Sequence, residues 1–225
     1  FFYIKVMELK KTEDGSHTIY IESIDETYHS IHGAIQEANH VFIKNGINLI
    51  NLNKINILEV GFGTGLNAIL TLEFALNNQI NINYTGIETN PLSKKLINKL
   101  NYINLISNPI LEIPFNKLHA CKWEVENKIT PNFNLKKINI NVFQFKSNNK
   151  FDLIYYDAFG PNSQPEMWTK EIFQNLFQIL NNDGIFVTYC AKGQVKRDLK
   201  STGFIVNSVP GPPGKREMTI AFKKM

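Results

Sequence analysis

The sequence predicts an α/β fold built on a mostly parallel sheet of seven strands, with an antiparallel edge at the C-terminal end of the chain. Three observations lead to this expectation. Short apolar segments alternate with amphipathic ones from residue 55 to residue 201, which is typical of strands that alternate with covering helices. A glycine-rich turn at residues 61–65 follows the first of these apolar segments. The last two apolar segments, residues 204–209 and 217–222, have no helical pattern between them and should pair antiparallel.

The N-terminal residues predict a β-hairpin followed by a helix. Residues 4–9 and 17–23 are expected strands, and they flank Asp14-Gly15, a dipeptide that closes hairpins. Residues 33–44 carry apolar side chains at helical spacing, and Asn45-Gly46 ends that pattern.

The later elements are expected in regular order. Asn90 is a favourable cap for the helix expected at residues 91–100. Pro91 suits the first position of that helix, where no backbone donor is needed. Pro109 and Pro114 break up the stretch after that helix, and the sequence does not fix the place of the two strands that follow. The expected strands are residues 55–60, 82–88, 123–129, 133–142, 151–157, 185–190, 204–209 and 217–222, and the expected helices are residues 66–77, 91–100, 166–180 and 194–201.

Length and composition indicate one folded unit. The chain has 225 residues, of which 43% are hydrophobic, and a formal net charge of +4, which excludes a disordered chain. Its longest apolar runs are far shorter than the roughly 20 residues of a spanning helix, and no secretory leader is visible. We expect residues 1–46 to form a hairpin and helix packed on the core, and residues 47–225 to form one globular domain. Two widely separated cysteines favour reduced thiols and a cytoplasmic protein.

The glycine turn carries the sharpest local signal. Gly61, Gly63 and Gly65 follow a strand and open a helix, and Glu59 precedes the first of them by two residues. A dinucleotide fingerprint places its third glycine one position later, where this chain has Leu66, and no Gly-Lys-Ser/Thr of a Walker loop follows. The turn can therefore hold a different nucleotide-like ligand, or it is an ordinary strand-to-helix connection.

A second acidic residue limits the class of ligand that the turn can bind. Glu88 ends the next expected strand, 23 residues beyond Gly65, where a carboxylate suits two ribose hydroxyls. The same carboxylate repels a ribose phosphate, which argues against NADP. These features favour a nucleoside ligand without phosphate, such as S-adenosylmethionine.

Asp157 is the candidate catalytic residue. It ends the apolar segment 151–157, and ligands of open α/β sheets bind outside the carboxyl ends of the strands. We therefore expect it to face the crevice of the glycine turn, where its alternative role is to cap the next turn. Tyr156 and Phe159 beside it could pack against a planar substrate, whereas Trp168 lies on the apolar face of its expected helix and belongs to the core.

Positive charge gathers at the C-terminal end. From residue 192 onward eight residues are basic and two are acidic. Such a surface can steer a polyanion, with a solvated lysine-rich edge as the alternative. Lys215 and Arg216 are the residues expected to meet phosphates.

Four motifs together resemble the MnmC/MnmD-type tRNA methyltransferases. The resemblance extends from about Asp14 to Phe222, and its combination of motifs is more specific than the glycine turn alone. The motifs are Tyr28-His-Ser-x-x-Gly-Ala-Ile-Gln-Glu37, Gly61-Phe-Gly-Thr-Gly-Leu-Asn67, Asp157-Ala-Phe-Gly-Pro with Pro165-Glu-Met-Trp168, and Gly214-Lys-Arg-Glu-Met218.

This resemblance implies a class I, Rossmann-like methyltransferase that uses S-adenosylmethionine. The implied reaction methylates 5-aminomethyl-2-thiouridine at the wobble position of tRNA and gives 5-methylaminomethyl-2-thiouridine. The implied partner is the tRNA anticodon loop, with separate enzymes supplying the aminomethyl precursor, no membrane, and no FAD oxidase domain in this chain. Asp157 is implied as the catalytic residue. The expected cofactor-binding residues are Tyr28, Ser30, Glu59, Gly61, Gly63, Thr64, Gly65, Asn67 and Glu88, and the expected substrate-binding residues are Tyr156, Phe159, Lys215 and Arg216.

Several points and alternatives stay open at this level. Many class I methyltransferases place an Asp against the adenine amino group, and the sequence offers only Gln144 as a guess for that role. The histidines show no metal-ligand spacing, so no metal site is expected. The alternatives are an aminopropyltransferase, which needs several acids around a polyamine channel, a nicotinamide oxidoreductase, and a non-catalytic RNA-binding module.

Overall fold

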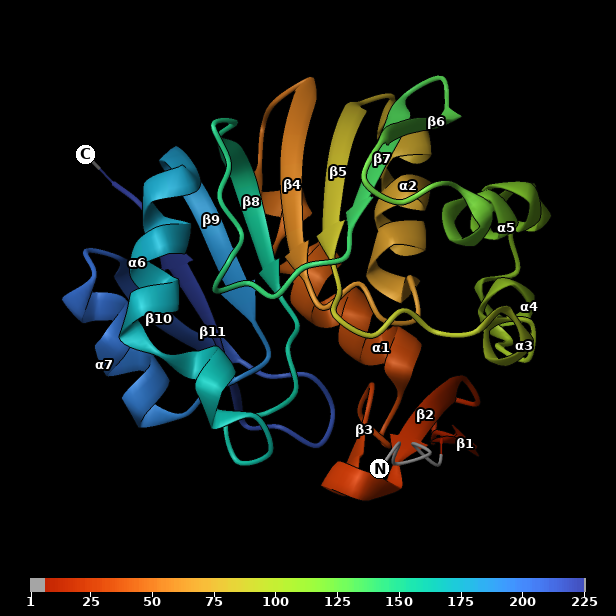
Figure 1. The fold of residues 1–225 in the computed structure, drawn as a ribbon, viewed down its shortest axis with the longest axis horizontal. Coiled ribbons are helices and arrows are strands. Elements are labelled where there is room, and N and C mark those ends of the chain that lie inside the picture. The colour runs from red at the N-terminus through yellow and green to blue at the C-terminus, as the bar shows by residue number, and fades with distance from the viewer. Residues whose placement is uncertain (1–6, 225) are drawn as a thin grey trace.

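The computed structural model describes residues 7–224 (Figure 1). Its strands are β1 (Met7–Lys11), β2 (His17–Ile21), β3 (Glu26–Thr27), β4 (Lys54–Val60), β5 (Asn81–Ile87), β6 (Glu126–Thr130), β7 (Phe133–Ile138), β8 (Phe151–Tyr156), β9 (Leu180–Thr188), β10 (Ile205–Pro210) and β11 (Glu217–Phe222). Its α-helices are α1 (Ala34–Ala38), α2 (Leu66–Asn78), α3 (Lys94–Ile97), α4 (Tyr102–Ile106), α5 (Glu112–Ala120), α6 (Lys170–Ile179) and α7 (Gly193–Ser201). Shorter helical turns are η1 (Glu22–Ile24), η2 (Asn39–Lys44), η3 (Ile47–Leu49), η4 (Pro109–Leu111) and η5 (Pro165–Trp168), and η2 is a π-helix that continues α1.

The main sheet confirms the predicted α/β class. Its strands lie in the order β10-β11-β9-β8-β4-β5-β7-β6, and the pairs β4–β5, β4–β8, β5–β7 and β8–β9 are parallel. The last two strands of the chain pair antiparallel at one edge, as expected. The sheet has eight strands, one more than predicted, because the hairpin of β6 and β7 places β7 beside β5 and adds β6 at the other edge.

Helices cover both faces of this sheet. Successive side chains of a strand point to opposite faces, so Ile57 packs in the cluster beneath α2 while Leu58 packs in the cluster beneath α6 and α7. Figure 1 shows α6 and α7 on one side of the strands and α2 on the other. Because β4 pairs parallel with both β5 and β8, the carboxyl ends of these three strands lie at one edge of the sheet.

The N-terminal segment forms a small sheet of its own. β1 and β2 pair antiparallel around the Asp14-Gly15 turn, which confirms the hairpin, while predicted strand residues 4–6 lie outside the described part of the chain. The helix predicted at residues 33–44 is α1 with η2, and Val41 and Phe42 join the cluster beneath α2. The division at residue 46 stays a prediction.

Two helix predictions near prolines were wrong. The helix expected from Pro91 begins three residues later as α3, because the hydroxyl of Ser93 accepts a hydrogen bond from the backbone of Leu96 and caps it. Pro114 was expected to interrupt helical structure, but it does not. It lies at the third position of α5, and a proline in the first turn removes no hydrogen bond from the helix.

The helix predicted at residues 166–180 is divided in the structure. Residues up to Trp168 form η5, and α6 begins after Thr169, whose side chain caps it. Trp168 is buried and its indole N–H donates to the Phe159 carbonyl at 2.7 Å, which confirms its expected place in the core.

Candidate active site

The loop between β4 and α2 lines a cavity at the carboxyl ends of the parallel strands. Gly61 and Gly63 have φ angles of +90° and +47°. A Cβ atom at residue 61 would lie 2.6 Å from the backbone oxygen of Asp157, and one at residue 63 would lie 3.0 Å from the ring of Tyr28. Glycine is therefore required at both positions, and the loop presents its backbone to the cavity.

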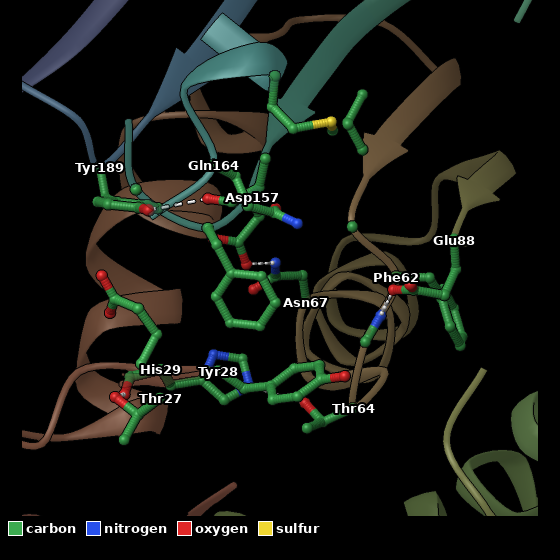
Figure 2. Close-up of a pocket in the computed structure, with 18 of the residues that line it drawn as sticks. Thr27, Tyr28, His29, Phe62, Thr64, Asn67, Glu88, Asp157, Gln164 and Tyr189 are labelled. Atoms are coloured by element: carbon green, nitrogen blue, oxygen red, sulfur yellow. Dashed lines mark hydrogen bonds between the residues drawn. The ribbon is translucent and has the colours of Figure 1, made fainter. Parts of the chain in front are cut away.

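Glu88 lies on the same side of the cavity, just beyond β5. One of its carboxylate oxygens accepts a hydrogen bond from the Gly63 N–H at 3.0 Å, and the other accepts from the Asn90 N–H at 2.8 Å. Figure 2 shows the first of these bonds, with Glu88 beside Phe62 and the loop. The carboxylate is fixed by two backbone donors and remains half-buried at the cavity, where it suits a pair of sugar hydroxyls.

Asp157 reaches the cavity from the end of β8. Its N–H donates to the Val60 carbonyl at 2.9 Å, which ties the ends of β8 and β4 together. Its Oδ2 accepts a hydrogen bond from Asn67 Nδ2 at 2.8 Å. Burial and, to a smaller extent, the negative charge of Glu37 raise the pKa of Asp157, while Asn67 and Lys215 partly oppose them, and together these effects bring that pKa to about 7. Asp157 can therefore take up or release a proton near neutral pH.

The segment before α1 closes the opposite wall. The rings of Tyr28 and Phe159 meet edge to face, with centroids 5.1 Å apart. His29 Nε2 lies 2.7 Å from the hydroxyl of Thr64, and burial lowers the pKa of this histidine to about 4, so its ring is neutral at pH 7. Figure 2 shows Tyr28, His29 and Thr64 close together at one side of the cavity. The N-terminal segment thus completes the site that the sheet begins.

A charged pair that the sequence did not reveal lies near Asp157. Lys215 Nζ is 2.6 Å from Glu37 Oε1 and 3.9 Å from the centre of the Tyr189 ring. Glu37 is buried, and its other oxygen accepts a hydrogen bond from the Ser30 N–H at 2.8 Å. The pair connects α1 with the loop between β10 and β11 and lines the cavity.

The cavity has a volume of about 410 Å³, and it brings together most of the predicted residues. Figure 2 shows Glu88 at one side of it and Gln164 and Tyr189 at the other, and Asn90, Asn141, Asp157 and Lys215 are also among the lining residues. The predicted residues that line it are Tyr28, Ser30, Gly61, Gly63, Thr64, Asn67, Glu88, Asp157, Phe159 and Lys215.

Four predicted site residues do not line the cavity. Gly65 forms the N-cap of α2 behind the loop. Glu59 is buried behind Asn67, which donates to its carboxylate at 2.9 Å. Tyr156 points into the core, because the alternation along β8 turns it toward Trp168 and its hydroxyl donates to the Met167 carbonyl. Arg216 is exposed and lines a neighbouring hollow.

Other functional candidates were missed. Glu37, Tyr189 and Gln164 line the cavity but were assigned no role. Glu37 closes the first motif of the resemblance, and that position was the available signal. Gln144 is exposed and is not a lining residue, whereas Asn141 and its two neighbours do line the cavity.

Residues 7–224 contain neither a candidate metal cluster nor a membrane-spanning helix. Within residues 7–224, no group of three or more His, Cys, Asp or Glu side chains could hold a metal ion. In the same part of the chain, no helix has the length and hydropathy needed to cross a membrane. That the protein is cytoplasmic stays a prediction.

Comparison with known proteins finds one family model that matches residues 104–224, and its description is S-adenosyl-L-methionine-dependent methyltransferase. An uncharacterized protein of Methanocaldococcus jannaschii is 26% identical over 96% of this chain and 59% of its own length. The tRNA 5-methylaminomethyl-2-thiouridine biosynthesis bifunctional protein MnmC of Leptospira interrogans is 30% identical over 88% of this chain. The chain spans about a third of the length of that relative.

Two solved structures share the fold. The crystal structure of MNMC2 from Aquifex aeolicus has a TM-score of 0.77 and 25% identity, and the match covers 98% of this chain and 73% of that one. Spermidine synthase from Thermotoga maritima has a TM-score of 0.59 and 15% identity, over 98% of this chain and 69% of that one. The second likeness concerns the fold alone.

Proposed function

Because the chain belongs to the S-adenosyl-L-methionine-dependent methyltransferase family, we propose that it methylates the amine of 5-aminomethyl-2-thiouridine at the tRNA wobble position. The product would be 5-methylaminomethyl-2-thiouridine, the nucleoside in the name of the MnmC relative. The observation that carries the proposal is the position of Asp157, which lines one cavity with the glycine loop and Glu88.

The residues of the glycine loop, together with Glu88, fit S-adenosylmethionine, and we call them the cofactor cradle. The glycine loop can pass this close to Asp157 and Tyr28 because residues 61 and 63 lack a Cβ atom, and two backbone donors orient the Glu88 carboxylate, which suits ribose hydroxyls. Gly61, Gly63, Thr64 and Glu88 would hold the nucleoside, and Asn141 is our candidate for the base. When bound, S-adenosylmethionine supplies a methyl group on a sulfonium sulfur, which keeps the electron pair of the broken carbon–sulfur bond.

The chain's own residues have to manage the proton of the amine. An alkylamine has a pKa of about 10 and is mostly protonated at neutral pH, so it lacks a free electron pair. Asp157 has a pKa of about 7 and is ionised in about half of the molecules at that pH. We assign Asp157 to take one proton from the ammonium group, and then to orient the electron pair of the neutral amine by a hydrogen bond. The neutral nitrogen attacks the methyl carbon, and the methylated nitrogen carries the positive charge as a secondary ammonium.

The RNA side of the cavity has an aromatic wall and a basic rim. Bases of single-stranded loops are splayed out and stacked on aromatic side chains, and Phe159 is the half-buried ring in position to receive one. Lys192 and Arg216 are exposed beside the neighbouring hollow and suit phosphates. Lys215 is bound to Glu37, so we assign it to the structure of the cavity rather than to RNA.

Nucleoside mass spectrometry tests the proposal. The protein would be incubated with S-adenosylmethionine and tRNA from a strain that lacks this methyltransferase activity, and the tRNA would then be digested. We expect 5-aminomethyl-2-thiouridine to gain one methyl group, and tRNA without that nucleoside to gain none. Tight cofactor binding without methylation of this nucleoside would contradict the proposal.

The acidic residues that line the cavity favour a second candidate function, an aminopropyltransferase activity. The sequence suggested too few acids for a polyamine site, but Glu26, Glu37 and Glu166 line the cavity together with Asp157. The pairing of Glu37 with Lys215 removes one of these acids from ligand binding. Incubation with decarboxylated S-adenosylmethionine and a diamine would reveal this activity by an aminopropyl product.

A further inference from the structure

We propose that Glu59 is a positioning residue that acts on Asp157 through the side chain of Asn67. The inference rests on the proposed function, because it concerns the residue assigned to the proton of the amine. It assigns Glu59 a role other than cofactor binding, since this buried carboxyl group does not line the cavity.

The geometry of Asn67 carries the argument. Its Nδ2 donates one hydrogen bond to Glu59 Oε1 at 2.9 Å and another to Asp157 Oδ2 at 2.8 Å. A side-chain amide nitrogen has two hydrogens in one plane, so both are used. The acceptor at Glu59 therefore fixes the rotation of the amide, and the amide fixes the carboxylate of Asp157. Figure 2 shows the bond between Asn67 and Asp157 at the cavity wall.

The surroundings of Glu59 favour its neutral form. Its side chain is 1% exposed, and no Lys, Arg or His within residues 7–224 forms an ion pair with it. Burial raises the pKa of Glu59 well above its usual range, and the nearby charge of Asp157 raises it further. A carboxyl group in such a place keeps its proton while its carbonyl oxygen still accepts the bond from Asn67.

A neutral Glu59 leaves Asp157 as the group of the pair that changes charge. The other groups that act on Asp157 are Glu37 from α1 and Lys215 from the loop between β10 and β11. The hydroxyl of Tyr189, directly after β9, donates to the neighbouring Ala158 carbonyl at 2.8 Å. The proton from the amine then goes to Asp157, and Glu59 keeps its own. Loss of the acceptor at residue 59 would free one Asn67 hydrogen and let the amide turn away from Asp157.

Two substitutions separate this role from a general structural one. Glu59→Gln keeps an acceptor oxygen and the neutral charge, whereas Glu59→Leu keeps the size but removes the acceptor. We expect Glu59→Gln to retain at least about a third of kcat, and Glu59→Leu to lower kcat by about 10-fold while the KM for S-adenosylmethionine changes by less than about threefold.

A double-mutant cycle with Asp157→Asn supplies the decisive comparison. If Glu59 acts through Asp157, Glu59→Leu should change the rate of the Asp157→Asn variant by less than about twofold. Multiplied losses in the double variant, equal losses in Glu59→Gln and Glu59→Leu, or no loss in Glu59→Leu would each overturn the inference. A wild-type rate in Asp157→Asn alone would instead contradict the proposed role of Asp157.

The pH profile of Glu59→Gln tests the inference even if Glu59→Leu does not fold. If Glu59 is already neutral, replacing it by Gln removes no charge. The midpoint of the acid limb in Glu59→Gln should then lie within about 0.3 pH unit of the wild-type midpoint. A displacement of the limb by about one unit or more would mean that Glu59 is ionised during turnover, and would overturn the inference.

Discussion

Asn67 Nδ2 lies 2.8 Å from Asp157 Oδ2, although 90 residues separate the two in the sequence. The contact joins the first turn of α2 to the residue that follows β8, and it places the amide of the helix against the carboxylate at the end of the strand. In the proposed reaction, the proton acceptor is thus held by the same helix whose N-terminal loop would bind the cofactor. Cofactor binding and orientation of the acid would then depend on one local structure.

Asp157→Asn should separate chemistry from binding. The amide can still accept the hydrogen bond from Asn67, but it cannot take a proton at neutral pH. We expect kcat to fall by about 100-fold, and the affinity for S-adenosylhomocysteine, measured by calorimetry, to stay within a few-fold of wild type. Asp198→Asn, at a partly exposed acid of α7 outside the cavity, is the matched control. Unchanged single-turnover methylation in Asp157→Asn would remove this residue from the mechanism.

Glu88→Ala should weaken cofactor binding more than it slows the chemical step. The substitution removes the carboxylate that accepts from Gly63 and Asn90, together with the proposed partner of the ribose hydroxyls. We expect the Kd for S-adenosylhomocysteine to rise by about 10-fold or more, with a smaller effect on kcat at saturating cofactor. Glu126→Ala, on the edge strand β6, is the control. Equal affinities for wild type and Glu88→Ala would argue against this orientation of the nucleoside.

Lys215→Met should lower stability, because it leaves the buried carboxylate of Glu37 without its cation. Lys215 is partly exposed, so we expect a loss of about 2 kcal/mol in the free energy of unfolding, or roughly 4–8 °C in Tm. The double variant Glu37→Gln/Lys215→Met should recover part of that loss. A Tm that is lower in the double variant than in Lys215→Met would show that the pair is not what connects α1 to the loop.

Arg216→Gln should weaken tRNA binding without changing chemistry. The side chain is exposed outside the cavity, so its removal leaves the cofactor cradle intact. We expect the Kd for tRNA to rise severalfold, and the slope of log Kd against log salt concentration to decrease by about 1. Lys54→Gln, at the opposite end of β4, is the control. An unchanged slope would place the phosphates elsewhere.

The strands were predictable because apolar periodicity and turn residues determine them locally. The bounds of β11 agree with the prediction at both ends, and those of β4 and β8 agree within one residue. The short helices α4 and α5 were missed, since the prolines around them were interpreted as breaks although Pro114 occupies a helical first turn.

The site was predictable where a motif follows a strand, and not where two distant segments meet. Gly61, Glu88 and Asp157 each end or follow a parallel strand, so topology alone brings them to one edge. The contact of Glu37 with Lys215 spans 178 residues and depends on how the N-terminal unit packs. Tyr156 was predicted to bind substrate, but β8 is a central strand whose two faces are both buried. The side chain of Tyr156 therefore lies in the core.

The central claim is that Asp157 accepts the proton of the substrate amine, and the pH dependence of single-turnover methylation tests it most directly. Burial raises the pKa of Asp157 to about 7, so its ionised form is lost as pH falls below that value. We predict that the wild-type rate falls about 10-fold per unit below a break within about one unit of pH 7. In Asp157→Asn the rate should instead keep rising toward the pKa of the amine, about 10. A break near pH 7 that persists in Asp157→Asn would contradict the claim.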